Sequence, residues 1–158
     1  MTFSTADLHD THESKVRVAN VLMQSYGQKA RFSGPIATVK CFEDNSLVRA
    51  ALEEPGNGRV LVVDGGGSIR CALVGDKLAA LALNNGWTGL VVHGCIRDAA
   101  VIATLNTGIK ALGTNPRRSV KQGQGERDIP LAFADTIFMP GHWLYADEDG
   151  ILLSSAEL

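Results

Sequence analysis

Three residues whose side chains suit metal and anion chemistry, Asp76, Arg97 and Asp98, lie within a single stretch of the chain. A carboxylate is a hard oxygen ligand of the kind that Mg²⁺ and Mn²⁺ take, usually with several water molecules completing the shell. Arginine presents a planar fork of N–H donors that matches the oxygen atoms of a carboxylate. These residue types are compatible with a site for a divalent cation and a small organic acid, although they do not by themselves establish one.

The elements around these residues are expected to bring them to one edge of a sheet. The apolar pattern over 76–82 predicts a helix, which Asn84-Asn85-Gly86 ends. The apolar run 90–92 predicts a buried parallel strand, with Arg97-Asp98 at its C-terminal end and a second helix over 99–106. Ligands of open α/β sheets bind outside the carboxyl ends of the strands, which is where this arrangement places the three side chains.

Helix capping is the alternative interpretation of the two aspartates. A short acidic side chain at a helix start accepts hydrogen bonds from exposed N–H groups, and Asp76 and Asp98 both stand where such a cap is needed. A lone arginine beside a turn, such as Arg97, is most often solvated. Local sequence alone therefore favours capping without further function.

The spacing of the three residues supplies a second argument. Twenty residues separate Asp76 from Arg97, and Asp98 follows at once. This D-x20-R-D pattern resembles the signature of the divalent-metal-dependent 4-hydroxy-4-methyl-2-oxoglutarate aldolases, which are similar to the RraA family (regulator of ribonuclease E activity A). Further segments that resemble the family are V-L-V-V-D-G-G-G-S at 60–68, A-L-G-T at 111–114, G-E-R-D at 125–128 and L-Y-A-D-E-D-G at 144–150.

The order of the expected elements favours an α/β protein with mixed sheets. The family resemblance sharpens this to a layered β/β/α swivelling domain, with residues 1–158 forming one RraA-like domain. It also implies a homotrimer with the cleft near subunit interfaces. In the family the glycines at 65–67 line the floor of that cleft, so the same position is expected here.

The activity that the resemblance implies is that of a class II aldolase. The enzyme would cleave 4-hydroxy-4-methyl-2-oxoglutarate into two pyruvates through a metal-stabilised pyruvate enolate, with oxaloacetate decarboxylation as a secondary activity. The resemblance makes Asp98 the ligand of the Mg²⁺ or Mn²⁺ ion and gives catalytic roles to Arg97 and Asp76. The expected substrate-binding residues, which include N–H groups at a helix start, are Gly75, Asp76, Lys77, Leu78 and Arg97.

The general base that takes the 4-hydroxyl proton is left open by the sequence. The candidates are Asp76 acting through water, a hydroxide on the metal, or an acid from a neighbouring subunit. Two positions depart from the family pattern. Val101 replaces an acid that some members carry three residues after the R-D aspartate, and His142 stands where an aspartate is expected. Both departures bear on efficiency and on the preferred substrate.

Two other functions compete with the aldolase. The first is a regulatory protein that binds and inhibits the endoribonuclease RNase E, which the intact D-x20-R-D motif makes less favoured. The second is an S-adenosylmethionine-dependent methyltransferase, for which Gly65–Gly67 would be the cofactor loop. No acidic ribose-binding residue follows that loop in a matching βαβ unit, which disfavours it.

Composition narrows the remaining possibilities. The formal net charge is −2, so no general nucleic-acid footprint is expected. No apolar run approaches the roughly 20 residues that span a bilayer. The three cysteines have no metal-type spacing, which favours reduced thiols packed in a cytoplasmic protein. The cations at 117–121 are interpreted as a solvated loop, or as a patch that steers anionic substrates or receives RNA or an acidic partner.

Overall fold

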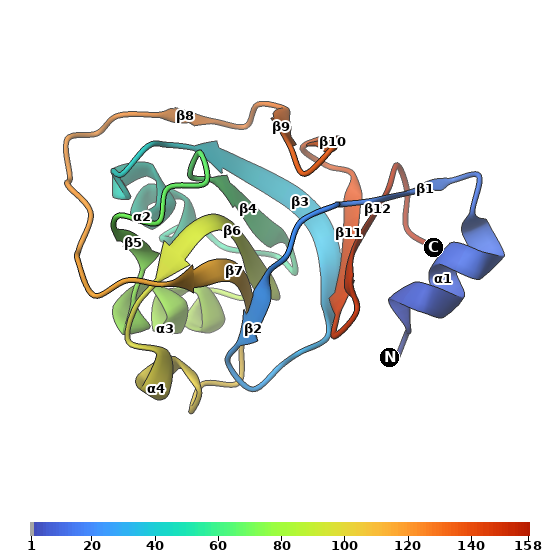
Figure 1. Ribbon diagram of the computed structural model, residues 1–158, viewed down its shortest axis with the longest axis horizontal. Coiled ribbons are helices and arrows are strands. Elements are labelled where there is room, and N and C mark those ends of the chain that lie inside the picture. The colour runs from blue at the N-terminus through green and yellow to red at the C-terminus, as the bar shows by residue number, and fades with distance from the viewer. Residues whose placement is uncertain (1) are drawn as a thin grey trace.

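A large mixed sheet organises the computed structural model, which describes residues 2–158; three helices cover one face of its parallel part, and the N-terminal helix lies at the far end beside the last two strands (Figure 1). The helices are α1 (Thr5–His12), α2 (Ser46–Leu52), α3 (Asp76–Asn84) and α4 (Ala99–Ile102). The strands are β1 (Val16–Val18), β2 (Gln24–Tyr26), β3 (Phe32–Lys40), β4 (Val60–Asp64), β5 (Ala72–Val74), β6 (Gly89–Ile96), β7 (Gly108–Thr114), β8 (Glu126–Arg127), β9 (Leu131–Phe133), β10 (Thr136–Phe138), β11 (Trp143–Asp147) and β12 (Gly150–Ser154).

Strand β3 joins an antiparallel part of the sheet to a parallel part. Residues 32–35 pair antiparallel with β11, and residues 36–40 pair parallel with β4. The strand order runs β1-β12-β11-β3-β4-β6-β7-β2, with β5 added beside β6. The predicted mixed sheet is therefore confirmed, and its parallel part carries the predicted strand at 90–92.

Two apolar cores lie on opposite faces of the parallel strands. One contains Leu61, Val63 and Val92 together with the buried faces of α2, α3 and α4. The other contains Val62 and Val91 together with side chains of β10, β11 and β12. Buried on both faces, these strands read as continuous apolar runs in the sequence. The expected β/β/α layering is confirmed.

Most predicted elements are present, and two differ in extent. Helix α4 ends at Ile102 rather than near residue 106, because the chain tightens into i−3 turns, with Thr104 N–H donating to Val101 O at 3.0 Å and the Thr104 hydroxyl to the same oxygen at 2.7 Å. In the segment 16–26, apolar and polar residues typical of extended chain predict a strand or extended piece, and the structure divides it into β1 and β2 at opposite edges of the sheet.

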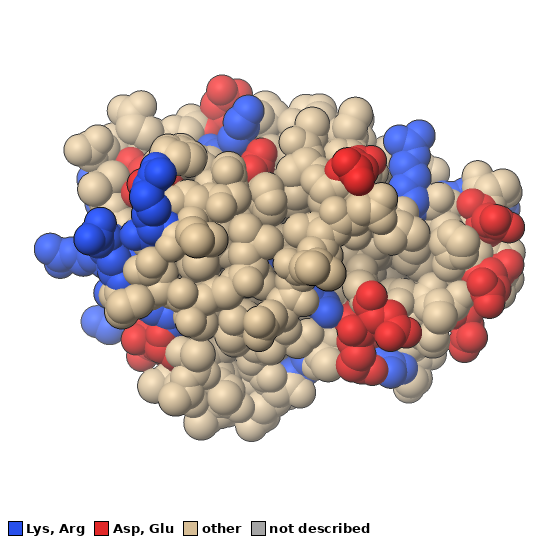
Figure 2. Space-filling model, in the orientation of Figure 1, with Lys and Arg blue, Asp and Glu red and all other residues tan. Residues whose placement is uncertain are grey.

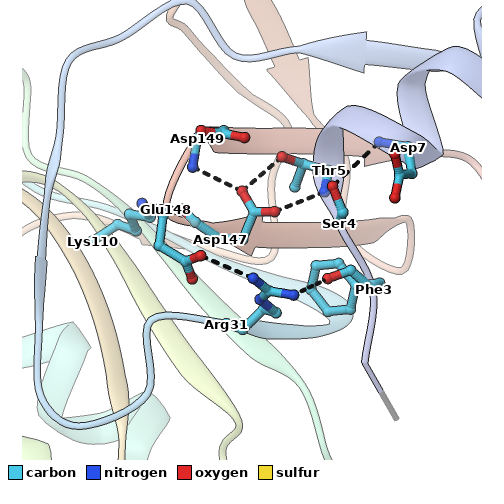
Figure 3. A network of polar contacts seen from close by, with 9 residues as sticks. All are labelled: Phe3, Ser4, Thr5, Asp7, Arg31, Lys110, Asp147, Glu148 and Asp149. Carbon is cyan, nitrogen blue, oxygen red and sulfur yellow. Dashed lines mark hydrogen bonds and ion pairs between the residues drawn. The ribbon is translucent and has the colours of Figure 1, made fainter.

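Asp147, at the end of β11, fixes the N-terminal helix to the β11–β12 hairpin (Figure 3). Its carboxylate accepts hydrogen bonds from the Thr5 N–H at 2.7 Å, the Thr5 hydroxyl at 2.6 Å and the Asp149 N–H at 2.9 Å. The buried Lys110 ammonium donates to the Asp147 carbonyl. These hydrogen bonds lower the pKa of the Asp147 carboxyl, although burial acts in the opposite direction.

The three cysteines, Cys41, Cys71 and Cys95, are buried and free, as the sequence predicts. Burial raises the pKa of the Cys41 thiol to about 12, which keeps it protonated at neutral pH. Within residues 2–158, no helix is both long and apolar enough to cross a membrane.

Candidate functional site

The pairing of β5 with β6 brings the three chemically interesting residues together. Val74 is opposite Ile96 in this parallel ladder, and the Arg97 N–H donates to Val74 O at 2.9 Å. Two residues beyond each partner, the Asp76 N–H donates to the Asp98 Oδ2 atom at 3.1 Å. The D-x20-R-D spacing is thus the length of one β-α-β crossover whose two strands end side by side.

A cavity of about 270 Å³ opens beside these strand ends. Every site residue predicted from the sequence lines it, together with residues from α2 and from the segment between β7 and β8. The lining residues are Asn45, Arg49, Ala72, Gly75, Asp76, Lys77, Leu78, Arg97, Asp98, Arg118, Ser119 and Lys121.

Asp98 precedes α4 but does not cap it with its side chain. Its backbone is in the left-handed region, at φ 59° and ψ 38°, which Asp tolerates better than most residues. The carboxylate accepts instead from the Asp76 N–H at the start of α3. The pKa of Asp98 is lowered by that N–H, then by the Asp76 side chain and by the Arg97 charge. The capping interpretation is therefore wrong for Asp98.

Asp76 is the first residue of α3, and Gly75 occupies the N-cap position. The Asp76 Oδ1 atom accepts from the Lys77 N–H at 2.9 Å. Two of the N–H groups that the sequence offered as an anion site therefore already donate to carboxylates. The helix start does bind an anion, as its dipole favours, but in this structure that anion is Asp98.

Gly75 lets the Asp98 carboxylate approach the start of α3 closely. A Cβ atom at this position would lie 2.8 Å from Asp98 Oδ2 and 3.6 Å from the Arg97 Nε atom. The backbone of Gly75 is extended, a conformation that any residue can adopt. Any restriction on the side chain at this position therefore comes from the space available and not from the backbone conformation. This contact explains why a glycine stands at the entrance to α3.

Arg97 is half-buried at the edge of the cavity. Its Nη1 atom donates to Pro116 O at 3.3 Å, the one hydrogen bond of its side chain to residues 2–158. A guanidinium has five N–H donors, so most of the fork remains available to a ligand. Arg97 is thus positioned for bidentate recognition of carboxylate and keto oxygens.

The donor set suits a cation that keeps much of its water shell. Within residues 2–158 no three His, Cys, Asp or Glu side chains cluster as metal ligands. Asp98 is held ionised, and its Oδ1 atom accepts no hydrogen bond from the described chain. The neighbouring Asp76 carboxylate adds negative charge beside it. One or two carboxylates completed by water and substrate oxygens is how Mg²⁺ is usually held, so the residues fit the predicted ion.

The segment between β7 and β8 contributes residues that the sequence did not assign to the site. Arg118, Ser119 and Lys121 line the cavity, as does Arg49 of α2. The run of cations at 117–121 was the available signal, but it did not distinguish a solvated loop from a cavity wall. Ser119 carried no signal, because its importance depends on burial.

The glycines at 65–67 lie outside this cavity, contrary to the expectation that they form its floor. A Cβ atom on Gly65 would lie 2.6 Å from a Leu73 methyl group, and one on Gly67 would lie 3.4 Å from the His93 ring. These glycines therefore allow the loop to pack against β5 and β6. A larger cavity, of about 700 Å³, lies beside β1 and the C-terminal residues and contains none of the predicted site residues.

Comparisons with known proteins identify the family of this chain. The model of the RraA-like family, described as Aldolase/RraA, matches residues 5–153. A Burkholderia multivorans protein named "Putative 4-hydroxy-4-methyl-2-oxoglutarate aldolase" is 57% identical over 163 residues, which cover 100% of this chain and 99% of the relative.

Two solved structures resemble the chain over nearly its whole length. One, named S-adenosylmethionine: 2-dimethylmenaquinone methyltransferase, from Geobacillus kaustophilus, has a TM-score of 0.97 and 49% identity, and the match covers 99% of this chain and 97% of the other. The structure of the RNA-processing inhibitor RraA from Thermus thermophilis has a TM-score of 0.96 and 44% identity, and the match covers 100% of this chain and 96% of the other.

Proposed function

The chain belongs to the RraA-like family of Aldolase/RraA proteins, and we propose that it is a divalent-metal-dependent lyase that cleaves 4-hydroxy-4-methyl-2-oxoglutarate into two molecules of pyruvate. The observation that carries the proposal is the convergence of Asp76, Arg97 and Asp98 on one cavity, with Asp98 held ionised and one of its oxygens free. The name of the Burkholderia multivorans relative supports the same reaction.

The reaction breaks the bond between C3 and C4 of the substrate. A base removes the proton of the 4-hydroxyl group, C4 becomes the keto carbon of one pyruvate, and the electron pair of the broken bond passes to the other half as its enolate. Protonation at C3 then gives the second pyruvate. Negative charge develops on the keto oxygen at C2, so groups that stabilise that oxygen lower the barrier.

Three parts of the chain have roles in this scheme. The free fork of Arg97 donates to the carboxylate and keto oxygens of the substrate. Asp98 would hold a Mg²⁺ or Mn²⁺ ion, which would supply positive charge to the same oxygens. The start of α3 keeps Asp98 ionised and oriented, as outer-shell groups do for metal ligands. Asp76 is close enough to Asp98 to influence its pKa and is the candidate for proton transfer through water.

Oxaloacetate is expected as a second substrate. Loss of its distal carboxylate as CO₂ leaves the same pyruvate enolate, so the groups that stabilise the keto oxygen serve both reactions. The reaction needs no Schiff base between a lysine and the substrate. Lys77, which is exposed, is therefore assigned to the surroundings of the substrate carboxylate and not to covalent catalysis.

Metal removal tests the proposal directly. Purified protein is assayed for pyruvate release from 4-hydroxy-4-methyl-2-oxoglutarate and from oxaloacetate, with Mg²⁺ and with excess EDTA. Release from both substrates should stop in EDTA and return when Mg²⁺ is added in excess of the chelator. Release no faster than that of Mg²⁺ alone, or unaffected by EDTA, would contradict it.

The name of the Thermus thermophilis structure favours a second candidate, inhibition of an endoribonuclease of the RNase E type. In that case the outer surface of the protein would bind the nuclease, and the cavity would not be needed. An Asp98 variant would then still inhibit the nuclease. The packing of Gly65–Gly67 against β5 and β6 does not support a methyltransferase cofactor loop. The homotrimer and the cytoplasmic location, which the sequence implied, stay predictions.

A further inference from the structure

The segment between β7 and β8 forms part of the cavity wall, through Arg118, Ser119 and Lys121. The sequence left this segment as a solvated loop or as a patch that steers anionic substrates or receives RNA or an acidic partner. Two isolated parallel bridges attach it to the rest of the chain, one joining Ala72 to Arg118 and the other joining Asp44 to Val120. The Ala72 N–H donates to Arg117 O at 2.7 Å. Ser119 lies between the two bridges and lines the cavity.

Asp44 fixes the far end of the same segment. It is 1% exposed, and its Oδ2 atom accepts from the N–H groups of Gln122 at 2.8 Å and Gln124 at 3.2 Å. Its Oδ1 atom accepts from the N–H and hydroxyl of Ser46 at 2.9 and 2.6 Å. Despite its burial, these hydrogen bonds lower the pKa of Asp44 to about 2, so the attachment persists across the neutral range.

Ser119 is the unusual residue of this wall. It is 5% exposed, and its hydroxyl oxygen is one of the few buried side-chain atoms with no hydrogen-bond partner in residues 2–158. A buried hydroxyl without a partner is unfavourable by about 1–3 kcal/mol, and such groups need an explanation. Because Ser119 lines the cavity, a ligand bound there is the candidate partner for this hydroxyl.

The charge of the cavity indicates the kind of ligand. Five cationic side chains and two carboxylates line it. The ion pairs found within residues 2–158 involve none of these five cations. Figure 2 shows lysines and arginines gathered at the end of the molecule where this segment runs, and acidic residues gathered near α1 and the β11–β12 turn.

We propose that Ser119, between Arg118 and Lys121 on the wall that Asp44 holds, binds the second carboxylate of a dicarboxylic 2-oxo acid. The inference rests on the proposed function, which places the 2-oxo acid end of the substrate at Arg97 and Asp98. The substrate then spans the cavity, and its far carboxylate meets the hydroxyl of Ser119 and the two cations beside it. Ser119 is in this account a specificity-determining residue.

A matched pair of ligands isolates the second carboxylate. 2-Oxoglutarate and 2-oxopentanoate have the same length and differ only in whether the far end is a carboxylate or a methyl group. Their dissociation constants are measured by titration calorimetry in Mg²⁺ buffer, for the wild type and for Ser119→Ala. The wild type should bind 2-oxoglutarate more tightly, and the variant should lose about tenfold for 2-oxoglutarate alone.

Thr107→Val is the matched control. Thr107 is 1% exposed, and its hydroxyl likewise has no partner in the described chain, but it does not line the cavity. Removing an unpaired buried hydroxyl should leave the thermal midpoint equal or higher in both variants. Only Ser119→Ala should lose affinity for 2-oxoglutarate, which separates ligand binding from a structural role.

Equal affinity of the wild type for the two acids would overturn the proposal. An unchanged preference for 2-oxoglutarate in Ser119→Ala, or an equal loss for both acids, would also overturn it. Pyruvate release from 4-hydroxy-4-methyl-2-oxoglutarate is measured in parallel on the same preparations. A protein that releases no pyruvate but shows the expected binding pattern would remove the proposed reaction and keep the subsite.

Discussion

Asp147 ends a strand and Asp98 lies just beyond one, but the two side chains differ in burial and in the number of hydrogen bonds that they accept. Asp147 is 2% exposed, and three hydrogen bonds from Thr5 and Asp149 occupy both of its carboxylate oxygens (Figure 3). Asp98 is exposed and accepts one hydrogen bond, from the Asp76 N–H. Both have a lowered pKa and are ionised at neutral pH.

The comparison separates a structural carboxylate from one that can bind a ligand. The hydrogen bonds of Asp147 come from an N-terminal helix and a turn, so its charge is used to join two parts of the fold. The single hydrogen bond of Asp98 orients its carboxylate and leaves an oxygen toward a cavity rich in cations. The number of hydrogen bonds that the chain provides distinguishes these two aspartates better than their pKa shifts do.

After Asp98, the next largest effect on activity is expected at Arg97, which lines the same cavity. Arg97→Lys keeps the charge but replaces the planar fork by a single ammonium group. Turnover of 4-hydroxy-4-methyl-2-oxoglutarate should fall roughly 100-fold or more, as expected when an electrostatic donor to a developing oxyanion is lost. Steady-state kinetics measure this, and near-native turnover would mean that Arg97 only packs.

A smaller effect, on stability rather than activity, is expected at Asp147. Asp147→Ala leaves the Thr5 N–H and hydroxyl without partners and removes a negative charge near the buried Lys110. The expected loss is about 2–3 kcal/mol, or roughly 5–10 °C in the thermal midpoint. Scanning calorimetry measures it, with Asp147→Asn as the control that keeps an acceptor. Loss of turnover at a temperature where the variant is folded would contradict the structural role.

The sequence predicted the parts of the site that depend on local pattern. Apolar periodicity located α3 and the strand containing Val91, and the residue types at Asp76, Arg97 and Asp98 indicated the chemistry. The left-handed backbone of Asp98 and the pairing of β5 with β6 were not predicted. A three-residue strand has too little pattern to detect, and a backbone conformation at one residue leaves no periodic signal.

The basic wall of the cavity was missed for a different reason. Its position depends on hydrogen bonds from Gln122 and Gln124 to Asp44, which lies 78 and 80 positions away in the chain. In the sequence, Asp44 carries no signal that connects it to the cations at 117–121, and those cations fit a solvated loop as well as a patch for anions. Only the folded chain shows that the buried carboxylate of Asp44 holds the segment that contains these cations, and that Ser119 in the same segment is buried.

Asp98→Asn tests the central claim most directly, because it keeps the shape and the acceptor for the Asp76 N–H and removes only the charge. Pyruvate release from 4-hydroxy-4-methyl-2-oxoglutarate in Mg²⁺ and the thermal midpoint are measured on the variant and the wild type together. The account predicts that release falls to the level of Mg²⁺ alone while the midpoint stays within about 2 °C, since an exposed side chain adds little to stability. Release at the wild-type rate from the folded variant would contradict the claim that Asp98 is the ligand around which this site works.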